Sequence, residues 1–396
     1  MRRLRTLVIH PVLAPYRVDL FNHLAERLDL DLRFQRGDFN YHRAIDPQAL
    51  GRELRCPSGV LPGNRVVFDR DVPLGLARFI RERAPEVVVT SEFSGLSLAV
   101  GRAQTRSGAR FGHVIWSDEN LAMFRGHGWV RRSLRRLCLR RADTLVMCTE
   151  RIADLFARRY RFPRERIRCC AVHQAPESVR GRLGAAGEAG EGLLDELGVR
   201  GRKVVLYVGR LAPEKNLAMA LTAFARAFVS GGDEVFVFVG SGPLRAELER
   251  EAARIGLVGR VIFAGHRAGI GLAGCYRLAS LLVLPSAYEP YGAVVNEALL
   301  SGVPVLCSSE AGAAHLVREG INGERIDPAD PASLERALAA RRPTLKTADA
   351  LWRSERTNLM PVAFEEDVAG FVAAVEIAAT CAGRRPAEVA RERVPL

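Results

Sequence analysis

The chain has 396 residues, of which 48% are hydrophobic and 26% are charged. A chain of this length can bury large cores, and we expect it to form two or three domains. The composition excludes an intrinsically disordered chain, a collagen-like repeat and a small scaffold that depends on disulfides.

The charge is distributed unevenly along the sequence. The formal net charge is +13, from 58 basic and 45 acidic residues. Residues 1–192 hold 34 basic and 21 acidic side chains, so the whole surplus lies there and the remainder is neutral. This asymmetry indicates that the first half meets an anionic partner: a phosphate, an acidic glycan, a membrane surface or a nucleic acid.

The sequence carries no signal for secretion, for a membrane span or for a metal site. The eight cysteines have no C-x-x-C or Cys/His spacing, which favours reduced core cysteines. The N-terminal apolar stretch is short and broken by prolines, unlike a signal peptide. No apolar segment reaches the ~18 residues that a membrane-spanning helix needs. We therefore expect a cytoplasmic protein, which could lie peripherally on the inner face of the plasma membrane.

Short β-branched runs alternate with longer helical patterns, which is typical of parallel sheets covered by helices. Two α/β halves follow from this alternation. In the first half, strands are predicted at 6–10, 86–90, 112–117, 144–149 and 167–172. In the second half, they are predicted at 203–209, 234–240, 260–265, 281–286 and 304–308.

These patterns predict two doubly wound domains, 1–176 and 193–360. Between them, 177–192 is rich in Gly and Ala and poor in large apolar residues, so we expect a linker or mobile loop. The pattern of 361–383 predicts one long amphipathic helix, which could pack back on the N-terminal domain, and 384–396 is expected to be a frayed tail. Doubly wound sheets bind ligands beyond the carboxyl ends of their strands, so two facing sheets would enclose a site in a cleft.

The segment 285–309, PSAYEPYGAVVNEALLSGVPVLCSS, carries the most chemistry. We expect a buried strand to end at its start, a loop to carry Glu289 and a helix to begin near Ala293. At ~1.5 Å rise per residue, Glu297 lies only about 6 Å along the axis from that helix start, so both carboxylates can reach one small ligand. Carboxylates at such a site suit the hydroxyl groups of a ribose or a hexose.

The start of the same helix is a candidate phosphate site. The amides of Gly292, Ala293 and Val294 would lack intrahelical partners, and the helix dipole favours negative charge there. Gly292 also has no side chain to obstruct a close approach. Two cations, Arg210 and Lys215, follow the first strand of the second half and could neutralise a diphosphate leaving group.

A Gly-Ser-Gly turn, with Gly240 and Gly242, follows another strand of the second half. Such a turn either approaches a phosphate or simply connects a strand to a helix.

The ordered segments VGRLAPEKN, VGSGP, VIFAGH, PSAYEPYGAVVNEALLSGVPV and AGAAHLVREGINGERIDPAD resemble the C-terminal domain of family 4 glycosyltransferases. Members of that family are retaining enzymes of the GT-B fold, in which two Rossmann-like domains face each other across a cleft, and they use nucleotide sugars. The resemblance covers about residues 200–335 closely. It implies that Arg210 and Lys215 hold the donor diphosphate.

The same resemblance assigns roles to the acidic pair. It implies that Glu289 binds the hydroxyls of the donor sugar, that Glu297 binds the ribose and that the backbone at 292–294 binds the phosphates. His266, which follows VIFAG, would lie near the nucleobase. The nucleotide sugar is then a substrate, and no cofactor or metal is implied.

The N-terminal half resembles the family more loosely. Residues 10–30 resemble the first strand–helix turn of polysaccharide-building members, without the Gly-rich loop that other members have there. Arg17 lies near a helix start, where its charge opposes the dipole, so it either is exposed or meets an anionic ligand. Asp118 and Glu119 follow strand 112–117, where many members have a histidine that contacts the donor sugar. We interpret these two acids as acceptor-side residues.

Residues 123–143, MFRGHGWVRRSLRRLCLRRAD, combine seven arginines with apolar residues at helical spacing. Such a basic amphipathic helix either lies on anionic lipid or covers the domain with a solvated outer face. Trp129 at its edge favours lipid, whereas the general excess of arginine in this sequence favours the solvated face.

Together these features predict a retaining hexosyltransferase that acts in cell-envelope or capsular polysaccharide synthesis on a glycan or lipid-linked acceptor. A small natural-product acceptor and a non-catalytic sugar-nucleotide-binding protein are the alternatives. A dehydrogenase and a P-loop enzyme are excluded because their glycine-rich motifs are absent. Sparse aromatic platforms argue against nucleic acid as a partner.

Overall fold

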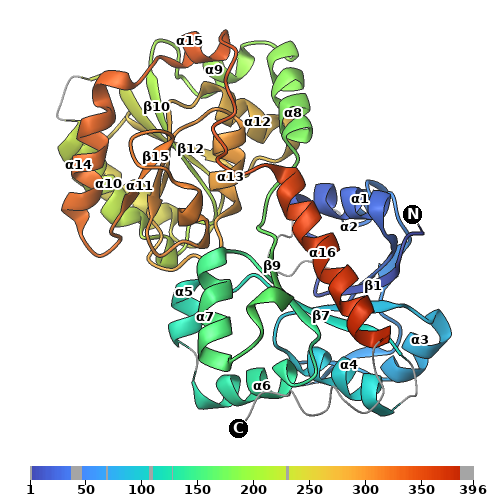
Figure 1. Ribbon diagram of the computed structural model, residues 1–396. Coiled ribbons are helices and arrows are strands. Elements are labelled where there is room, and N and C mark those ends of the chain that lie inside the picture. Colours follow the sequence, from blue (N-terminus) through green and yellow to red (C-terminus); the bar gives the residue numbers. More distant parts are fainter. Residues whose placement is uncertain are drawn as a thin grey trace. The chain divides into compact units, whose positions relative to one another are not determined.

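The computed structural model describes residues 2–36, 47–67, 70–106, 110–126, 128–228 and 232–383. The chain divides into two compact units, and each is built on a parallel sheet covered by helices (Figure 1). Unit 1 comprises Met1–His173 and Phe364–Leu396, and unit 2 comprises Gln174–Ala363. The tail expected at 384–396 lies outside the described residues. No helix in the described ranges is long and apolar enough to cross a membrane.

The sheet of unit 1 has seven strands in the order β3-β2-β1-β6-β7-β8-β9. All neighbouring strands pair in parallel. The chain builds outward from β1 to β3 and then from β6 to β9, so the order reverses between β1 and β6. The strands are β1 (Arg5–His10), β2 (Asp29–Phe34), β3 (Ser58–Val60), β6 (Val87–Ser91), β7 (Gly112–Ser117), β8 (Thr144–Met147) and β9 (Ile167–Cys169), with a separate antiparallel pair β4 (Asn64–Val67) and β5 (Arg70–Pro73).

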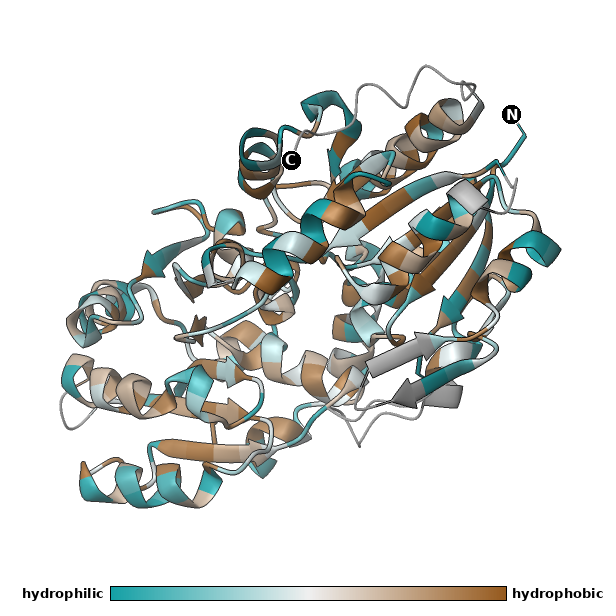
Figure 2. Ribbon diagram, turned by 90° about the horizontal axis from the view of Figure 1, so that it is seen from below, coloured by the Kyte–Doolittle hydropathy of each residue, from teal (hydrophilic) through white to brown (hydrophobic). Residues whose placement is uncertain are grey.

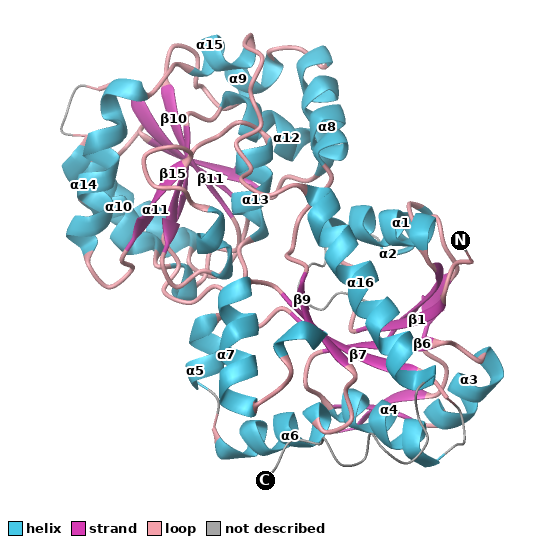
Figure 3. Cartoon of the chain, viewed as in Figure 1, coloured by secondary structure: helices cyan, strands magenta, loops and turns pink. Residues whose placement is uncertain are grey.

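Helices of unit 1 cover this sheet (Figure 3). They are the 3-10 helices η1 (Pro15–Arg17) and η2 (Arg164–Arg166) and the α-helices α1 (Val18–Arg27), α2 (Pro47–Arg52), α3 (Leu76–Arg83), α4 (Gly95–Arg106), α5 (Leu121–Gly126), α6 (Trp129–Leu139), α7 (Glu150–Tyr160) and α16 (Phe364–Gly383).

The helix expected at 361–383 is α16, and it belongs to unit 1 although it follows all of unit 2 in the sequence. It packs on β7, β8 and β9. The hydroxyl of Thr144 donates a hydrogen bond of 3.0 Å to the carbonyl oxygen of Ala374. A Cβ atom on Gly112 would lie 2.4 Å from the carbonyl of Ala378, so glycine is required for this close approach.

The sheet of unit 2 has six parallel strands in the order β12-β11-β10-β13-β14-β15. The order reverses between β10 and β13. Every residue of β11 is buried, and after Glu234 the strand is continuously apolar, because helices cover both faces of such a sheet. Figure 2 shows strands coloured brown, as hydrophobic, between the helices. The strands are β10 (Lys203–Val208), β11 (Glu234–Val239), β12 (Val261–Gly265), β13 (Leu281–Leu284), β14 (Val305–Ser308) and β15 (Gly323–Ile326).

Local signals in the sequence start several helices of unit 2. Helix α14, for example, begins with Pro331, and the carboxylate of Asp330 accepts a hydrogen bond of 3.0 Å from the amide of Ala332. The helices are η3 (Pro213–Lys215), η4 (Gly312–Leu316), η5 (Arg342–Thr344), α8 (Pro176–Glu188), α9 (Gly192–Glu196), α10 (Leu217–Ala227), α11 (Arg245–Arg254), α12 (Gly269–Leu278), α13 (Ala293–Leu300), α14 (Pro331–Arg341) and α15 (Ala348–Trp352).

The prediction that 177–192 is an unpacked linker is wrong. Helix α8 occupies most of that segment and lies beside α12 (Figure 1). Alanine is the best helix former, and small residues let two helices approach closely, so this composition suits a packed helix. The guanidinium of Arg277 on α12 donates a hydrogen bond of 3.3 Å to the carbonyl oxygen of Leu183, and it leaves little room for a side chain at Gly187.

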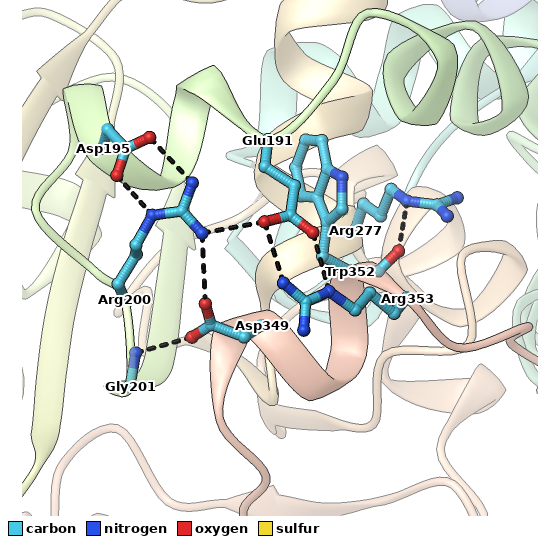
Figure 4. Close-up of polar contacts among 8 residues, drawn as sticks. All are labelled: Glu191, Asp195, Arg200, Gly201, Arg277, Asp349, Trp352 and Arg353. Atoms are coloured by element: carbon cyan, nitrogen blue, oxygen red, sulfur yellow. Dashed lines mark hydrogen bonds and ion pairs between the residues drawn. The ribbon is translucent and has the colours of Figure 1, made fainter.

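Polar contacts also fix the end of that segment (Figure 4). The carboxylate of Glu191 accepts hydrogen bonds of 2.7 and 3.0 Å from Arg353, and it lies 2.8 Å from Arg200. Hydrogen bonds from Arg353, and then from Arg200, lower the pKa of Glu191 to about 2. The carboxylate is therefore charged at any physiological pH and ties α9 to α15.

Candidate functional site

Lys215 and Glu289 form an ion pair at the carboxyl edge of the sheet in unit 2. Lys215 ends η3, which follows β10, and Glu289 lies in the loop between β13 and α13. The Nζ atom of Lys215 lies 2.6 Å from Oε2 of Glu289, and the two side chains are 15% and 12% exposed. Because β10 and β13 flank the point at which the strand order reverses, this pair occupies the usual ligand position of a doubly wound sheet.

Glu297, one turn into α13, is held in a fixed orientation by two donors. The Nε2 atom of Gln174 donates to Oε1 at 2.7 Å, and the hydroxyl of Tyr276 donates to Oε2 at 2.7 Å. Burial, and then the charge of Glu297, raise the pKa of Tyr276 well above its usual range, so the phenol keeps its proton and remains a donor. The oxygen of the Gln174 side chain accepts a hydrogen bond from Arg182 on α8.

The start of α13 has the geometry expected of an anion site. Gly292 precedes the helix with a φ angle of 94°, in the left-handed region that favours glycine. A Cβ atom there would lie 2.8 Å from Leu284 and 3.2 Å from Glu289. Ala293 and Val294 are the first two helical residues, so their amides have no intrahelical partner.

Gly240 and Gly242 have a packing role. A Cβ atom on Gly240 would lie 1.9 Å from the carbonyl oxygen of Gly209, and one on Gly242 would lie 2.3 Å from the carbonyl oxygen of Leu211. The loops after β10 and β11 therefore press against each other, which explains both glycines without a ligand. This observation favours the strand-to-helix turn over direct phosphate contact.

Arg210 and His266 are at the same edge but outside the pair. Arg210 is exposed and forms an ion pair of 2.5 Å with Glu214. His266 directly follows β12 and is exposed. Successive strand ends in the order β12, β11, β10 and β13 thus carry His266, the glycine turn, the two cations and Glu289.

In unit 1, Arg17 is buried, and a carboxylate of the same chain neutralises its charge. Arg17 is 1% exposed, forms an ion pair with Asp118, and lies over the ring of Trp116 with its Cζ atom 4.2 Å from the centroid. The expectation of an exposed Arg17 is wrong. The negative charge that offsets the unfavourable helix position comes from the chain itself.

Glu119 faces the core and is unsuited to the predicted acceptor-side role. It is buried, and its Oε1 atom lies 2.5 Å from Arg135, whose guanidinium also donates 2.9 Å to the hydroxyl of Tyr160. Burial raises the pKa of Glu119 to about 7, although Arg135 opposes the shift. Arg135 itself packs 5.0 Å from the ring of Phe156.

Glu92, which no sequence motif marks, organises this edge of unit 1. It directly follows β6 with a φ angle of 60°, a left-handed conformation that costs a residue other than glycine about 1 kcal/mol or more. Its carboxylate accepts hydrogen bonds of 2.7 Å from the hydroxyl of Ser117 and 3.0 Å from the amide of Asp118. Burial, and then the charge of Asp118, raise the pKa of Glu92 to about 6.

Residues 123–143 form parts of α5 and α6, and His127 lies outside the described residues. Trp129, at the start of α6, is 74% exposed, and Val130 and Leu137 are also exposed. Arg135 points inward, so the seven arginines do not form one solvated face. Across the described ranges, no group of three or more His, Cys, Asp or Glu side chains is placed to hold a metal ion.

Comparisons with known proteins match both units. The family model described as "Glycosyl transferase 4-like domain" matches residues 14–172, and the one described as "Glycosyl transferases group 1" matches residues 195–340. An alpha-D-kanosaminyltransferase of Streptomyces kanamyceticus is 32% identical over 49% of this chain and 49% of its own length. A 2-deoxystreptamine N-acetyl-D-glucosaminyltransferase of Streptomyces fradiae is 31% identical over 59% of this chain and 53% of its own. The matches span about half the length of these curated relatives.

A solved structure is similar over nearly the whole chain. Anabaena HepE in complex with UDP superposes with a TM-score of 0.68 at 18% identity, covering 96% of this chain and 99% of HepE. At this identity the similarity concerns the fold. The two matched domains, their order along the sequence and the shared fold show that the chain belongs to the family 4 glycosyltransferases of the GT-B fold.

Proposed function

We propose that the protein is a retaining glycosyltransferase that moves a hexose from a nucleotide sugar to a hydroxyl group of an acceptor. The observation that carries the proposal is the Lys215–Glu289 ion pair beside the uncapped start of α13, with Glu297 one turn further along. These groups offer one cation and bare amides for the diphosphate of such a donor, and one carboxylate each for the sugar and the ribose on either side of it.

Each part of the donor has a candidate partner in unit 2. A diphosphate would compete with Glu289 for Lys215, and the carboxylate released in this way could accept hydrogen bonds from the sugar hydroxyls. The surface pair between Arg210 and Glu214 is worth about 0–1 kcal/mol, so Arg210 can leave it for a phosphate at little cost.

Glu297 suits the ribose because its orientation is already fixed. Gln174 and Tyr276 each use one lone pair of the carboxylate, and two oxygens offer about four such sites. Each oxygen can therefore accept a further hydrogen bond from a ribose hydroxyl. The carboxylate loses little conformational freedom on binding, which favours affinity.

The proposed chemistry is electrostatic and needs no protein nucleophile. The bond between the sugar C1 atom and the phosphate oxygen breaks, and its electron pair leaves with the diphosphate, which Lys215 and the amides of Ala293 and Val294 stabilise. The acceptor oxygen forms the new bond to C1 on the same face and passes its proton to the departing phosphate oxygen. Glu289 orients the sugar during this exchange.

Two acceptor classes fit the chain. A lipid-linked cell-envelope or capsular intermediate would suit the basic first half and the exposed Trp129. A small soluble acceptor would suit the two Streptomyces relatives, one of which is named for transfer to 2-deoxystreptamine. The relatives favour the second class.

Thermal unfolding in the presence of nucleotide sugars tests the proposal. A ligand at 100 times its dissociation constant should add about 2.7 kcal/mol to the free energy of unfolding. Lys215→Ala should abolish this stabilisation and the release of UDP or another nucleoside diphosphate. Lys203→Ala is the matched control, because Lys203 pairs with Asp233 at the opposite end of the same strand. Stabilisation and turnover that are equal in both variants would contradict the proposal.

A further inference from the structure

His10, the last residue of β1, presents a free hydrogen-bond acceptor at the carboxyl edge of unit 1. Its Nδ1 atom lies 2.7 Å from the carbonyl oxygen of Val12. A carbonyl oxygen can only accept, so Nδ1 carries the ring proton and Nε2 of the neutral ring carries the lone pair. Nε2 has no hydrogen-bond partner among the residues that the structure describes. The side chain is only partly buried.

The imidazole stays neutral at physiological pH. Burial, and after it the positive charge of Arg17, lower the pKa of His10 to about 4, against a smaller opposing effect of Asp118. At pH 7 the ring therefore accepts a hydrogen bond at Nε2 and does not carry charge.

The Arg17–Asp118 pair next to His10 has polar atoms left over. Within the described ranges, Nε and Nη1 of Arg17 and Oδ1 of Asp118 are buried and have no hydrogen-bond partner, and the same holds for Nε1 of Trp116. Each such atom costs about 1–3 kcal/mol if nothing pairs with it. The Asp118 side chain is 34% exposed, whereas Arg17 is 1% exposed, so Asp118 connects these buried donors and acceptors with the surface of unit 1.

The indole ring of Trp116 contacts both His10 and Arg17. The ring of Trp116 lies 5.4 Å from the ring of His10, and Arg17 stacks on it at 4.2 Å. Phe371 of α16 packs edge-on against the same indole at 5.1 Å. The carboxylate of Glu92 accepts a hydrogen bond from the backbone amide of Asp118, which fixes the position of that residue after β7.

The cluster also occupies the ligand position of its sheet. The strand order of unit 1 reverses between β1 and β6. His10 ends β1, Glu92 follows β6 and Asp118 follows β7, so the three residues stand at successive strand ends across the reversal. Ligands of doubly wound sheets bind at this point.

From this geometry we propose that His10 and Asp118 form an acceptor subsite in unit 1 that binds the hydroxyl groups of a neutral polyol ring. This inference rests on the proposed function and names the substrate class of its acceptor side. A hydroxyl group both donates and accepts, so one that enters beside the partly exposed side chain of Asp118 can donate to its Oδ1 atom and accept from a leftover N–H group of Arg17. A second hydroxyl donates to Nε2 of His10.

A phosphorylated acceptor fits this subsite poorly. A phosphate dianion could accept from Arg17, but it would face the charge of Asp118 and has no proton to give to Nε2 of His10. Asp118 already neutralises the charge of Arg17 in their ion pair. The subsite is therefore selective for uncharged, hydroxyl-rich rings over their phosphate esters.

The experiment compares acceptors with a donor already identified by thermal unfolding. Wild-type protein is given that nucleotide sugar together with myo-inositol, scyllo-inositol or inositol 1-phosphate, and sugar transfer is measured by mass spectrometry and nucleotide release. We expect transfer to an unphosphorylated ring, with kcat/KM about tenfold or more above that of the phosphate ester. Preference for the phosphate ester, or no transfer to either unphosphorylated ring, would overturn the proposal.

Variants then connect the preference to the subsite. His10→Phe keeps the aromatic contacts and removes the acceptor atom, so the acceptor KM should rise about tenfold while kcat changes little. His10→Gln restores a donor and an acceptor and should recover part of the loss. His23→Phe, on α1, controls for the loss of an imidazole elsewhere in unit 1. An acceptor KM that does not change in His10→Phe would overturn the assignment of His10.

Asp118→Asn is the second test. It removes the charge that pairs with buried Arg17 and can therefore prevent folding, which is why the His10 variants carry the main test. Where Asp118→Asn folds, discrimination against inositol 1-phosphate should weaken several-fold, and unchanged discrimination would count against the subsite. The proposed function fails separately, because its failure appears as a wild-type protein that no nucleotide sugar stabilises.

Discussion

The side chain of Gln174 donates a hydrogen bond of 2.7 Å to the carboxylate of Glu297. Gln174 is the first residue of unit 2, and its backbone amide also donates 3.0 Å to Asn296 of α13. The point at which the chain enters unit 2 is thus fastened to the carboxylate that we assign to the ribose.

This contact predicts a specific effect on nucleotide affinity. Gln174→Ala should weaken UDP binding about tenfold, because Glu297 loses one of the two donors that orient it. Isothermal titration with UDP measures the effect. In a Glu297→Ala background the same change should have almost no further effect, since a residue that acts through Glu297 cannot act without it. Additive losses in the double variant would show that Gln174 acts elsewhere.

Glu289→Gln should separate catalysis from nucleotide binding. The amide keeps the shape of the side chain but removes the charge that we assign to the donor sugar, so kcat should fall about 100-fold. UDP lacks the transferred sugar, so Glu289→Gln should change the affinity for UDP less than threefold, and only because Lys215 loses its ion-pair partner. Glu319→Gln, in an exposed pair with Arg325, is the control. A parallel loss of UDP affinity and kcat would place Glu289 on the nucleotide.

His10 predicts the direction of a pH effect on stability. Its pKa is about 4 in the folded protein and near the ordinary 6.5 in the unfolded chain. Between these values the unfolded chain binds more protons, so the free energy of unfolding falls as the pH falls from 6.5 towards 4. His10→Phe lacks this contribution, and its loss of stability between pH 8 and pH 5 should be smaller by about 2 kcal/mol. Urea unfolding at the two pH values measures this difference, and equal losses in both proteins would refute it.

Helix α6 predicts selective binding to anionic membranes. Trp129 is 74% exposed beside arginines on the same helix, an arrangement that suits a lipid surface of opposite charge. We expect cosedimentation with vesicles that contain phosphatidylglycerol and little with pure phosphatidylcholine. Trp129→Ala should weaken that binding several-fold, whereas Ile321→Ala, an exposed apolar residue of unit 2, should not. If binding depends neither on the charge of the lipid nor on Trp129, the prediction is wrong and α6 only covers the sheet of unit 1.

The contact between Lys215 and Glu289 was predictable because the residues that we assign to the donor lie in short, ordered segments. Glu289, Gly292 and Glu297 occur within nine consecutive positions, and Lys215 lies in the short segment that follows β10, the strand that pairs with β13. Strand ends of a parallel sheet meet at one edge, so local patterns were enough to bring these groups together. The fold class followed from the same alternation of strands and helices.

Other features depend on contacts between distant residues, which local patterns do not contain. Gln174 lies 123 positions from Glu297, and Arg17 lies 101 positions from Asp118. Burial also could not be foreseen from residue type. Arg17 was expected to be exposed or to meet an anionic ligand, and Glu119 was expected to face the acceptor, but both side chains are buried in ion pairs within the chain. Helix α8 was missed because small residues suit both a flexible linker and a tightly packed helix.

The position of α16 has a consequence for how the protein is made. Its residues cover β7, β8 and β9 but leave the ribosome only after the whole of unit 2 has been synthesised. Until then, the apolar surface around Trp116 and Gly112 that receives this helix is open to water and to other nascent chains. Unit 2 can therefore complete its folding first, and the part of the chain that is translated earliest is the last to be finished.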